Sequence, residues 1–191
     1  MSEPISALRQ RETSGSVQIR DTGLRGMITL RGDLSHGKLG STLKQITGQK
    51  MPGRNAVTLG ADTGLAWMSP DELLVMVPYA GVRDALDKIA KTMAGQHHLA
   101  VDVSDARSVM LVEGPFAREV IAKLAPVDLH PDVWQPGTII RSRLGQVAAA
   151  FWLRDPQTVE VICFRSVADY AFDLLAASAK AGPVGHFQRG I

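Results

Sequence analysis

The sequence predicts an α+β fold built from two copies of one β-α-β-β-β-α unit. The first observation behind this prediction is a repeat, because features of the first half return 85 residues later (144 − 59 and 152 − 67, for example). Upstream the spacing is 82 (114 − 32), so the second copy is expected to carry about three extra residues near positions 132–136. The matched pairs are Gly32 with Gly114, Leu59-Gly60 with Leu144-Gly145, Trp67 with Trp152, Pro70-Asp71 with Asp155-Pro156, and Gly81-Val82 with Ser166-Val167.

The second observation is that short runs of alternating or continuous apolar residues predict strands, with helical spacing between them. Antiparallel strands with their helices gathered on one side make an α+β fold. Stacked repeats need about three or more units, so two copies predict one pseudo-twofold domain. We expect this domain at residues 17–191, with the copies at about 27–95 and 108–182. Residues 1–16 are mostly polar with little periodicity, which predicts a flexible N-terminal tail.

Each element of the first copy follows from its local pattern. Its clearest helix places Val82, Leu86 and Ile89 on one face, with Gly95 after its end. The other elements are short apolar runs separated by Gly, Pro and Asp. In order, we expect strand 28–31, helix 39–46, strands 57–59, 65–68 and 73–77, helix 82–93, and a linking strand at 99–103.

The second copy is expected to repeat this order. Pro115 suits the first turn of a helix, and Pro126 ends that helix. Ser166 followed three residues later by Asp169 has the spacing of a capping box, with Asp in place of Glu. The expected elements are strand 109–112, helix 116–124, strands 139–144, 147–153 and 159–164, and helix 167–178.

Composition indicates a soluble, cytoplasmic protein with a substantial core. The 191 residues are 45% hydrophobic and 21% charged, with a formal net charge of +2. This near-balance argues against a nucleic-acid-binding protein, which usually has a concentrated basic stripe. No apolar run approaches the roughly 18 residues that a membrane span requires. Cys163 is the only cysteine, which excludes a disulfide framework and a thiol metal cluster.

Two candidate sites are better explained by structure than by chemistry. His97 and His98 are adjacent on an expected strand, so they point to opposite faces and cannot jointly bind one metal ion. Cys163 alternates with Val159 and Val161, and no motif supplies the base that a cysteine nucleophile needs. We therefore expect polar residues at a strand start and a packed thiol.

Asp102, Asp105 and Arg107 surround Ser104 where the first copy ends and the second begins. A carboxylate and a guanidinium at such a junction could orient a small amino-acid-like or pterin-like ligand. They could equally bind backbone groups at the junction. We favour the structural role, because nothing nearby completes a catalytic set.

Several arginines could form either a solvated basic face or a protein interface. Arg141 and Arg143 alternate along one strand, and Arg154 and Arg165 lie on the two strands that follow. Arg and aromatic residues are enriched at protein contacts. The interface candidates are Trp134, Arg141, Arg143, Trp152, Arg154 and Arg165. No Gly-rich phosphate loop is present, so no cofactor can be assigned to the chain from its motifs.

Four segments together resemble one known family. They are Met68-Ser69-Pro70-Asp71-Glu72, Val101-Asp102-Val103-Ser104-Asp105-Ala106-Arg107, Gly114-Pro115-Phe116-Ala117-Arg118 and Cys163-Phe164-Arg165-Ser166-Val167-Ala168-Asp169-Tyr170. This set resembles the gamma subunit family of heterotetrameric sarcosine oxidase, over roughly residues 19–177 and most strongly from Val101 onward. The strand, Ser-Pro-Asp-Glu, strand and helix module is also similar to the folate-binding domain of aminomethyltransferases such as the glycine cleavage T-protein.

The resemblance implies an accessory subunit of a soluble bacterial flavoenzyme that demethylates sarcosine oxidatively. The products would be glycine, hydrogen peroxide and a one-carbon unit passed to tetrahydrofolate. It places FAD, FMN and NAD in the alpha and beta subunits and zinc in the delta subunit, with no cofactor in this chain. No catalytic, cofactor-binding or metal-binding residue is carried over. Two alternatives remain, a free-standing folate-binding or aminomethyltransferase-like one-carbon module and a scaffold that self-associates as a twofold dimer.

Overall fold

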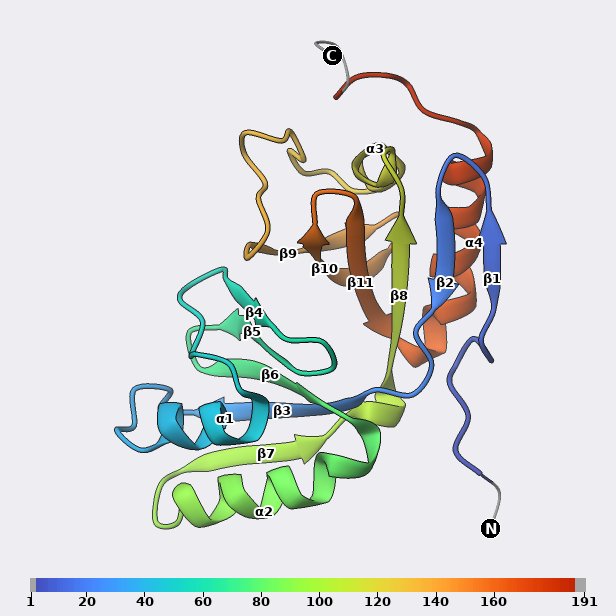
Figure 1. Cartoon of the computed structure of the whole chain (residues 1–191). Helices are drawn as coiled ribbons and strands as arrows, with labels where there is room; N and C mark the ends of the chain where they lie inside the picture. The colour runs from blue at the N-terminus through green and yellow to red at the C-terminus, as the bar shows by residue number, and fades with distance from the viewer. Residues whose placement is uncertain (1–2, 188–191) are drawn as a thin grey trace. The chain divides into compact units, whose positions relative to one another are not determined.

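The computed structural model describes residues 3–187 and divides the chain into two compact units (Figure 1). The central unit is Leu24–Ser104, and the terminal unit combines the chain up to Gly23 with the chain from Asp105 onward. Each unit has an antiparallel sheet and a hydrophobic core of its own. This architecture confirms the α+β class. Where the sequence predicted one duplicated domain, the structure separates the two copies into two units.

The central unit contains a five-stranded sheet in the order β4-β5-β6-β3-β7. Helices α1 and α2 share a core with one face of this sheet, through Leu39 and Leu43 of α1 and Ile89 of α2. The expected linking strand, β7, pairs with β3 and forms an edge of the sheet. The elements are β3 Gly26–Gly32, α1 Leu39–Thr47, β4 Val57–Leu59, β5 Gly64–Ser69, β6 Glu72–Val77, the 3₁₀ turn η1 Tyr79–Gly81, α2 Val82–Thr92 and β7 His98–Asp102.

The terminal unit contains a six-stranded sheet in the order β1-β2-β8-β11-β10-β9. Its core joins α3 and α4 to one sheet face, with Val120, Phe172, Phe151 and Val161 among the buried residues. The elements are β1 Glu12–Ser14, β2 Gln18–Asp21, η2 Ser104–Ala106, β8 Arg107–Glu113, α3 Ala117–Ala122, β9 Ile139–Leu144, β10 Val147–Asp155, β11 Thr158–Phe164, η3 Arg165–Val167 and α4 Ala168–Lys180.

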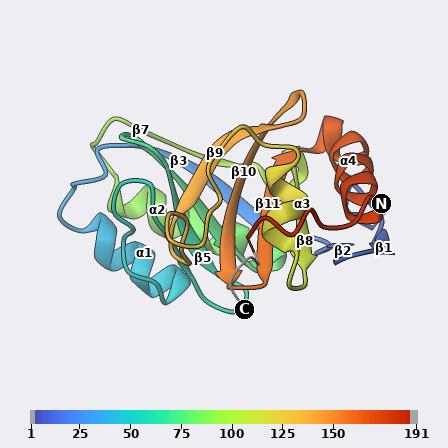
Figure 2. The ribbon, with the colours of Figure 1, turned by 90° about the horizontal axis from the view of Figure 1, so that it is seen from above.

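The N-terminal segment is ordered, so the prediction of a flexible tail at residues 1–16 is wrong for residues 3–16. β1 pairs with β2, and both strands lie beside α4 (Figures 1 and 2). Leu8 is only 4% exposed and belongs to the terminal core. Ser6 donates a hydrogen bond of 2.5 Å to the buried Asp21 carboxylate, and Arg11 lies 4.4 Å from the centre of the Phe172 ring. The segment is therefore part of the terminal unit.

The repeat is real, but the structure shifts its alignment. β-Bulges between Trp67 and Ser69 and between Leu153 and Asp155 match at a spacing of 86 (153 − 67). Val57 of β4 pairs with Ala66 of β5, and the matching pair is Ile139 of β9 with Trp152 of β10. The spacing is therefore 82 between β4 and β9 (139 − 57) and 86 between β5 and β10 (152 − 66). The change in spacing therefore falls inside the hairpin between β9 and β10.

That hairpin contains four extra residues, and the expected insertion near 132–136 is wrong. Four residues, 60–63, lie between the paired Leu59 and Gly64. Eight residues, 142–149, lie between the matching pair Arg141 and Ala150. Side chains alternate along a strand, so a shift of one residue moves a side chain to the other face. Trp67 accordingly packs against the central core, and its counterpart in the terminal core is Leu153 rather than Trp152.

Candidate functional site

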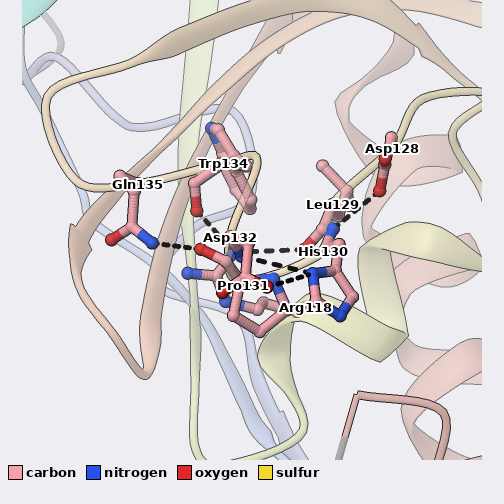
Figure 3. Close-up of polar contacts among 8 residues, drawn as sticks. All are labelled: Arg118, Asp128, Leu129, His130, Pro131, Asp132, Trp134 and Gln135. Carbon is pink, nitrogen blue, oxygen red and sulfur yellow. Dashed lines mark hydrogen bonds and ion pairs between the residues drawn. The ribbon is translucent and has the colours of Figure 1, made fainter.

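A buried arginine organises the loop between α3 and β9 (Figure 3). Arg118 of α3 is 9% exposed, and its Nη1 donates to the carbonyl oxygens of Leu129 at 3.1 Å and Trp134 at 2.8 Å. Its guanidinium also lies 5.3 Å from the centre of the Trp134 ring. Burial lowers the pKa of Arg118 from its usual value. Two carbonyl dipoles and an aromatic face replace part of the water that this charge loses.

The tryptophan in this loop is a core residue. Trp134 is 1% exposed, its Nε1 donates to the Thr138 carbonyl at 3.1 Å, and its ring meets Phe151 edge-on at 5.7 Å. Local bonds shape the rest of the loop, since the Asp128 carboxylate accepts from the His130 backbone at 2.9 Å. Trp134 is therefore unsuitable as a contact for a partner in this conformation, which corrects its place among the interface candidates.

Glu119, the neighbour of Arg118, binds the C-terminal segment. Its buried carboxylate accepts backbone hydrogen bonds from Val184 at 2.6 Å, Gly185 at 2.9 Å and Phe187 at 3.2 Å. Burial by itself raises the pKa of Glu119, but these N–H donors outweigh it and hold the pKa below its usual value. The carboxylate has a structural role, because its oxygens are occupied by the chain itself.

Two more interface candidates are wholly or partly buried. Arg154 is bound to Glu160 at 2.5 Å, and the Glu160 side chain is fully buried. Trp152 is opposite Glu160 in the β10–β11 pairing and is 0% exposed. A buried pair of this kind is costly to break, since removing one partner leaves a charge without compensation. Trp152 is therefore a buried residue and not a surface anchor, whereas Arg154 is paired with Glu160 and its side chain stays 21% exposed.

The remaining polar candidates also have structural roles. Cys163 is 2% exposed, and burial raises the pKa of its thiol to about 11, against a smaller lowering by Arg107. A thiol with this pKa is a poor nucleophile at neutral pH. Asp102 accepts hydrogen bonds from the backbone and hydroxyl of Ser104, and Ser104 Oγ accepts from the Met27 backbone at 2.9 Å. This chain of bonds joins the end of β7 to the start of β3.

Residues 3–187 contain neither a cluster of metal-binding side chains nor a membrane-spanning helix. No three His, Cys, Asp or Glu side chains in that range gather to hold a metal ion. His98 instead makes a hydrogen bond of 3.0 Å between its Nδ1 and the Gln96 carbonyl, and His97 is exposed beside it. No helix in the same range is long and apolar enough to span a bilayer.

Three of the predicted interface arginines are on the surface, together with an aromatic residue that sequence reasoning did not select. Arg141, Arg143 and Arg165 are exposed, and Phe164 is 50% exposed. Phe164 ends β11, directly after the run of buried residues 159–163, and no alternation along the strand marks it as exposed. Arg118, Glu119 and Glu160 were also missed. Nothing in their spacing predicts that charged residues are buried there.

Comparisons with known proteins agree with each other. Residues 31–181 match the model of the sarcosine oxidase gamma subunit family. The chain is 29% identical over 154 residues to sarcosine oxidase subunit gamma of Corynebacterium sp. (strain P-1), covering 80% of this chain and 74% of that protein. It is 27% identical over 161 residues to the same subunit of an Arthrobacter species, covering 82% and 76%.

Solved structures support the fold. The heterotetrameric sarcosine oxidase of Corynebacterium sp. U-96, in complex with pyrrole 2-carboxylate, contains a chain that matches with a TM-score of 0.78 at 24% identity, covering 89% of this chain and 88% of that one. The glycine cleavage aminomethyltransferase T of Bartonella henselae matches with a TM-score of 0.62 at 12% identity, covering 88% of this chain and 47% of that one. The predicted likeness to the aminomethyltransferase fold is thereby confirmed.

Proposed function

Because the chain belongs to the sarcosine oxidase gamma subunit family, we propose that it is the accessory gamma subunit of a heterotetrameric sarcosine oxidase. The observation that carries this proposal is the family match over residues 31–181. The assembled enzyme would demethylate sarcosine oxidatively to glycine and pass the one-carbon unit to tetrahydrofolate. Its alpha, beta and delta subunits would be the partners of this chain.

The buried polar groups of the chain support a non-catalytic role. The buried carboxylates of Glu119 and Glu160 bind backbone N–H groups and an arginine, respectively. The Cys163 thiol is packed in the terminal core with a pKa of about 11. A catalytic set would need a base positioned beside a nucleophile or a substrate. In line with the family resemblance, we propose that FAD, FMN, NAD, zinc and tetrahydrofolate bind to partner subunits.

The proposal is tested by co-expressing the chain, carrying an affinity tag, with candidate alpha, beta and delta subunits. We expect the tag to recover all four chains and a sarcosine-dependent production of hydrogen peroxide. The matched control omits this chain from the co-expression. Recovery of the tagged chain by itself, in cells where the other three subunits are soluble, would contradict the proposal.

The likeness to aminomethyltransferase T favours a second candidate, a free-standing folate-binding or one-carbon module. Calorimetric titration of the purified chain with 5-formyltetrahydrofolate separates the two functions. Stoichiometric binding by the chain alone would favour this module. No heat of binding, together with recovery of the four-chain complex, would favour the accessory subunit.

A further inference from the structure

One end of the terminal sheet exposes an aromatic residue between arginines, on the face away from α3 and α4. Phe164 is the last residue of β11 and is 50% exposed, whereas its neighbour Cys163 is buried in the core. Single exposed apolar side chains are common on protein surfaces, so the arginines around Phe164, and not its exposure alone, distinguish this site. We call the set Arg107, Arg143, Ala148, Phe164 and Arg165 the Phe164 surface.

The pairing register places four of these five residues in one row across four strands. Arg143 of β9 is opposite Ala148 of β10, and Phe164 of β11 is opposite Arg107 of β8. Ala149 pairs with Cys163, so the next step of the register brings Ala148 beside Phe164. The guanidinium of Arg107 lies 5.2 Å from the centre of the Phe164 ring. Ala148 is exposed, and its short side chain leaves the middle of this row accessible to solvent.

A shallow groove of about 550 Å³ runs beside the aromatic ring. Phe164, Arg165, Ser166 and Asp169 line it from η3 and its two flanks. Ala7 and Ala106 complete the lining. The ordered N-terminal segment supports this wall, because Arg165 Nη2 donates to the Ile5 carbonyl at 3.0 Å.

The charge of this surface is positive where it can reach a partner. Arg143 and Arg165 form no ion pair with any carboxylate in residues 3–187. The groove also contains the exposed carboxylate of Asp169, which lies 3.5 Å from Arg11 Nη1, while Arg11 Nη2 is 2.5 Å from Asp173. Arg and aromatic residues, Phe included, are enriched at protein interfaces, and Arg is also enriched among the residues that contribute most of the binding energy. Uncompensated guanidinium groups select a partner that carries carboxylates.

We propose that the Phe164 surface docks an acidic segment of a partner subunit. In this complex a carboxylate of the partner binds Arg143 or Arg165, and an apolar side chain of the same segment enters the groove against Phe164. The inference rests on the proposed function, because it names the surface by which this chain joins the assembly.

The test uses the complete four-chain complex and follows its dissociation by mass photometry as it is diluted. The variants are Phe164→Ala and the double charge reversal Arg143→Glu/Arg165→Glu. Leu99→Ala is the matched apolar control, because Leu99 of β7 is 51% exposed, and Arg83→Glu on α2 is the matched charge control. We expect Phe164→Ala to raise the apparent dissociation constant about 30-fold, as for an interface anchor, and the double reversal to raise it at least as much. Circular dichroism verifies that each variant chain is folded.

A salt titration of the unmodified complex gives a second measurement that needs no variant. Ion pairs between exposed groups weaken with ionic strength, so the wild-type complex should dissociate more readily in 0.5 M than in 0.05 M salt, and the double reversal should abolish this dependence. Wild-type affinity in both variants, with an intact wild-type complex, would overturn the docking surface and leave the proposed function standing. A symmetric dimer of this chain alone, lost in Phe164→Ala, would also overturn it, because the occupant would then be a second copy. Failure of the wild-type chains to assemble would reject both proposals.

Discussion

Replacing Leu8 by Ala should destabilise the terminal unit, although Leu8 lies in a segment whose composition predicts a flexible tail. Leu8 is 4% exposed and packs in the terminal core. Removing its buried methyl and methylene groups costs about 0.8 kcal/mol for each carbon, and the cavity left behind adds to this. The expected loss is about 2–4 kcal/mol. Other contacts of the segment are weaker, since the Arg11–Asp173 pair has side chains 41% and 62% exposed and contributes under about 1 kcal/mol.

The measurement is a thermal and urea unfolding series on the full chain, with Ile5→Ala as the control. Ile5 lies three residues away and is 57% exposed, so its truncation should change the free energy of unfolding by no more than about 0.5 kcal/mol. For a chain of this length, Leu8→Ala should lower Tm by about 5–10 °C. Equal melting temperatures for wild type, Ile5→Ala and Leu8→Ala would show that Leu8 does not stabilise the core, and would favour the original prediction of a flexible tail.

Four further changes have expected outcomes. Glu119→Gln should cost about 1–3 kcal/mol at pH 7 by urea unfolding; because the folded-state pKa of Glu119 is lowered, its contribution is present above the unfolded pKa and is lost as pH falls through the folded pKa, so the variant and wild type should converge in acid. Trp134→Ala should cost about 3–5 kcal/mol in urea unfolding, and complexes that do form should keep wild-type affinity. Cys163, with a thiol pKa of about 11, should resist iodoacetamide at pH 8 by mass spectrometry and react only in urea. Gly145→Ala should cost about 1–2 kcal/mol in thermal unfolding, because φ is +59° and the added Cβ would lie 2.5 Å from Leu174 Cδ1.

The order of elements could be predicted from the sequence because local patterns determine it. The helix from Val82 has a continuous apolar face, and the strand pairs around Pro70 and Pro156 are separated by turn residues. The alignment of the copies could not be predicted to one residue. Trp67 and Trp152 look equivalent by residue type, yet hydrogen-bond pairing places them on opposite faces of their sheets. Register depends on partner strands that are distant in the sequence.

Burial was the part of the candidate site that the sequence did not reveal. Arg154 and Glu160 are charged residues in strands, and a lone charged residue normally faces solvent. Glu160 is fully buried, and the ion pair at 2.5 Å across the hairpin with Arg154, whose side chain is 21% exposed, compensates its charge. Leu8 was missed for a similar reason, because a single apolar residue in a polar segment has no periodicity. Only the pairing of β1 with β2 brings it to the core.

The asymmetry of the repeat argues for a single docking surface. At the spacing of 86, the counterpart of Phe164 in the central unit is Pro78, so the exposed aromatic ring exists in the second copy alone (164 − 86). Arg143 belongs to residues 142–149, the longer hairpin end that replaces 60–63, and it has no single counterpart. A symmetric dimer through this surface would place the same patch of two chains face to face. Arg143 and Arg165 would then meet the same guanidinium groups of the second chain, and like charges disfavour that contact, so the Phe164 surface fits a different, acidic chain.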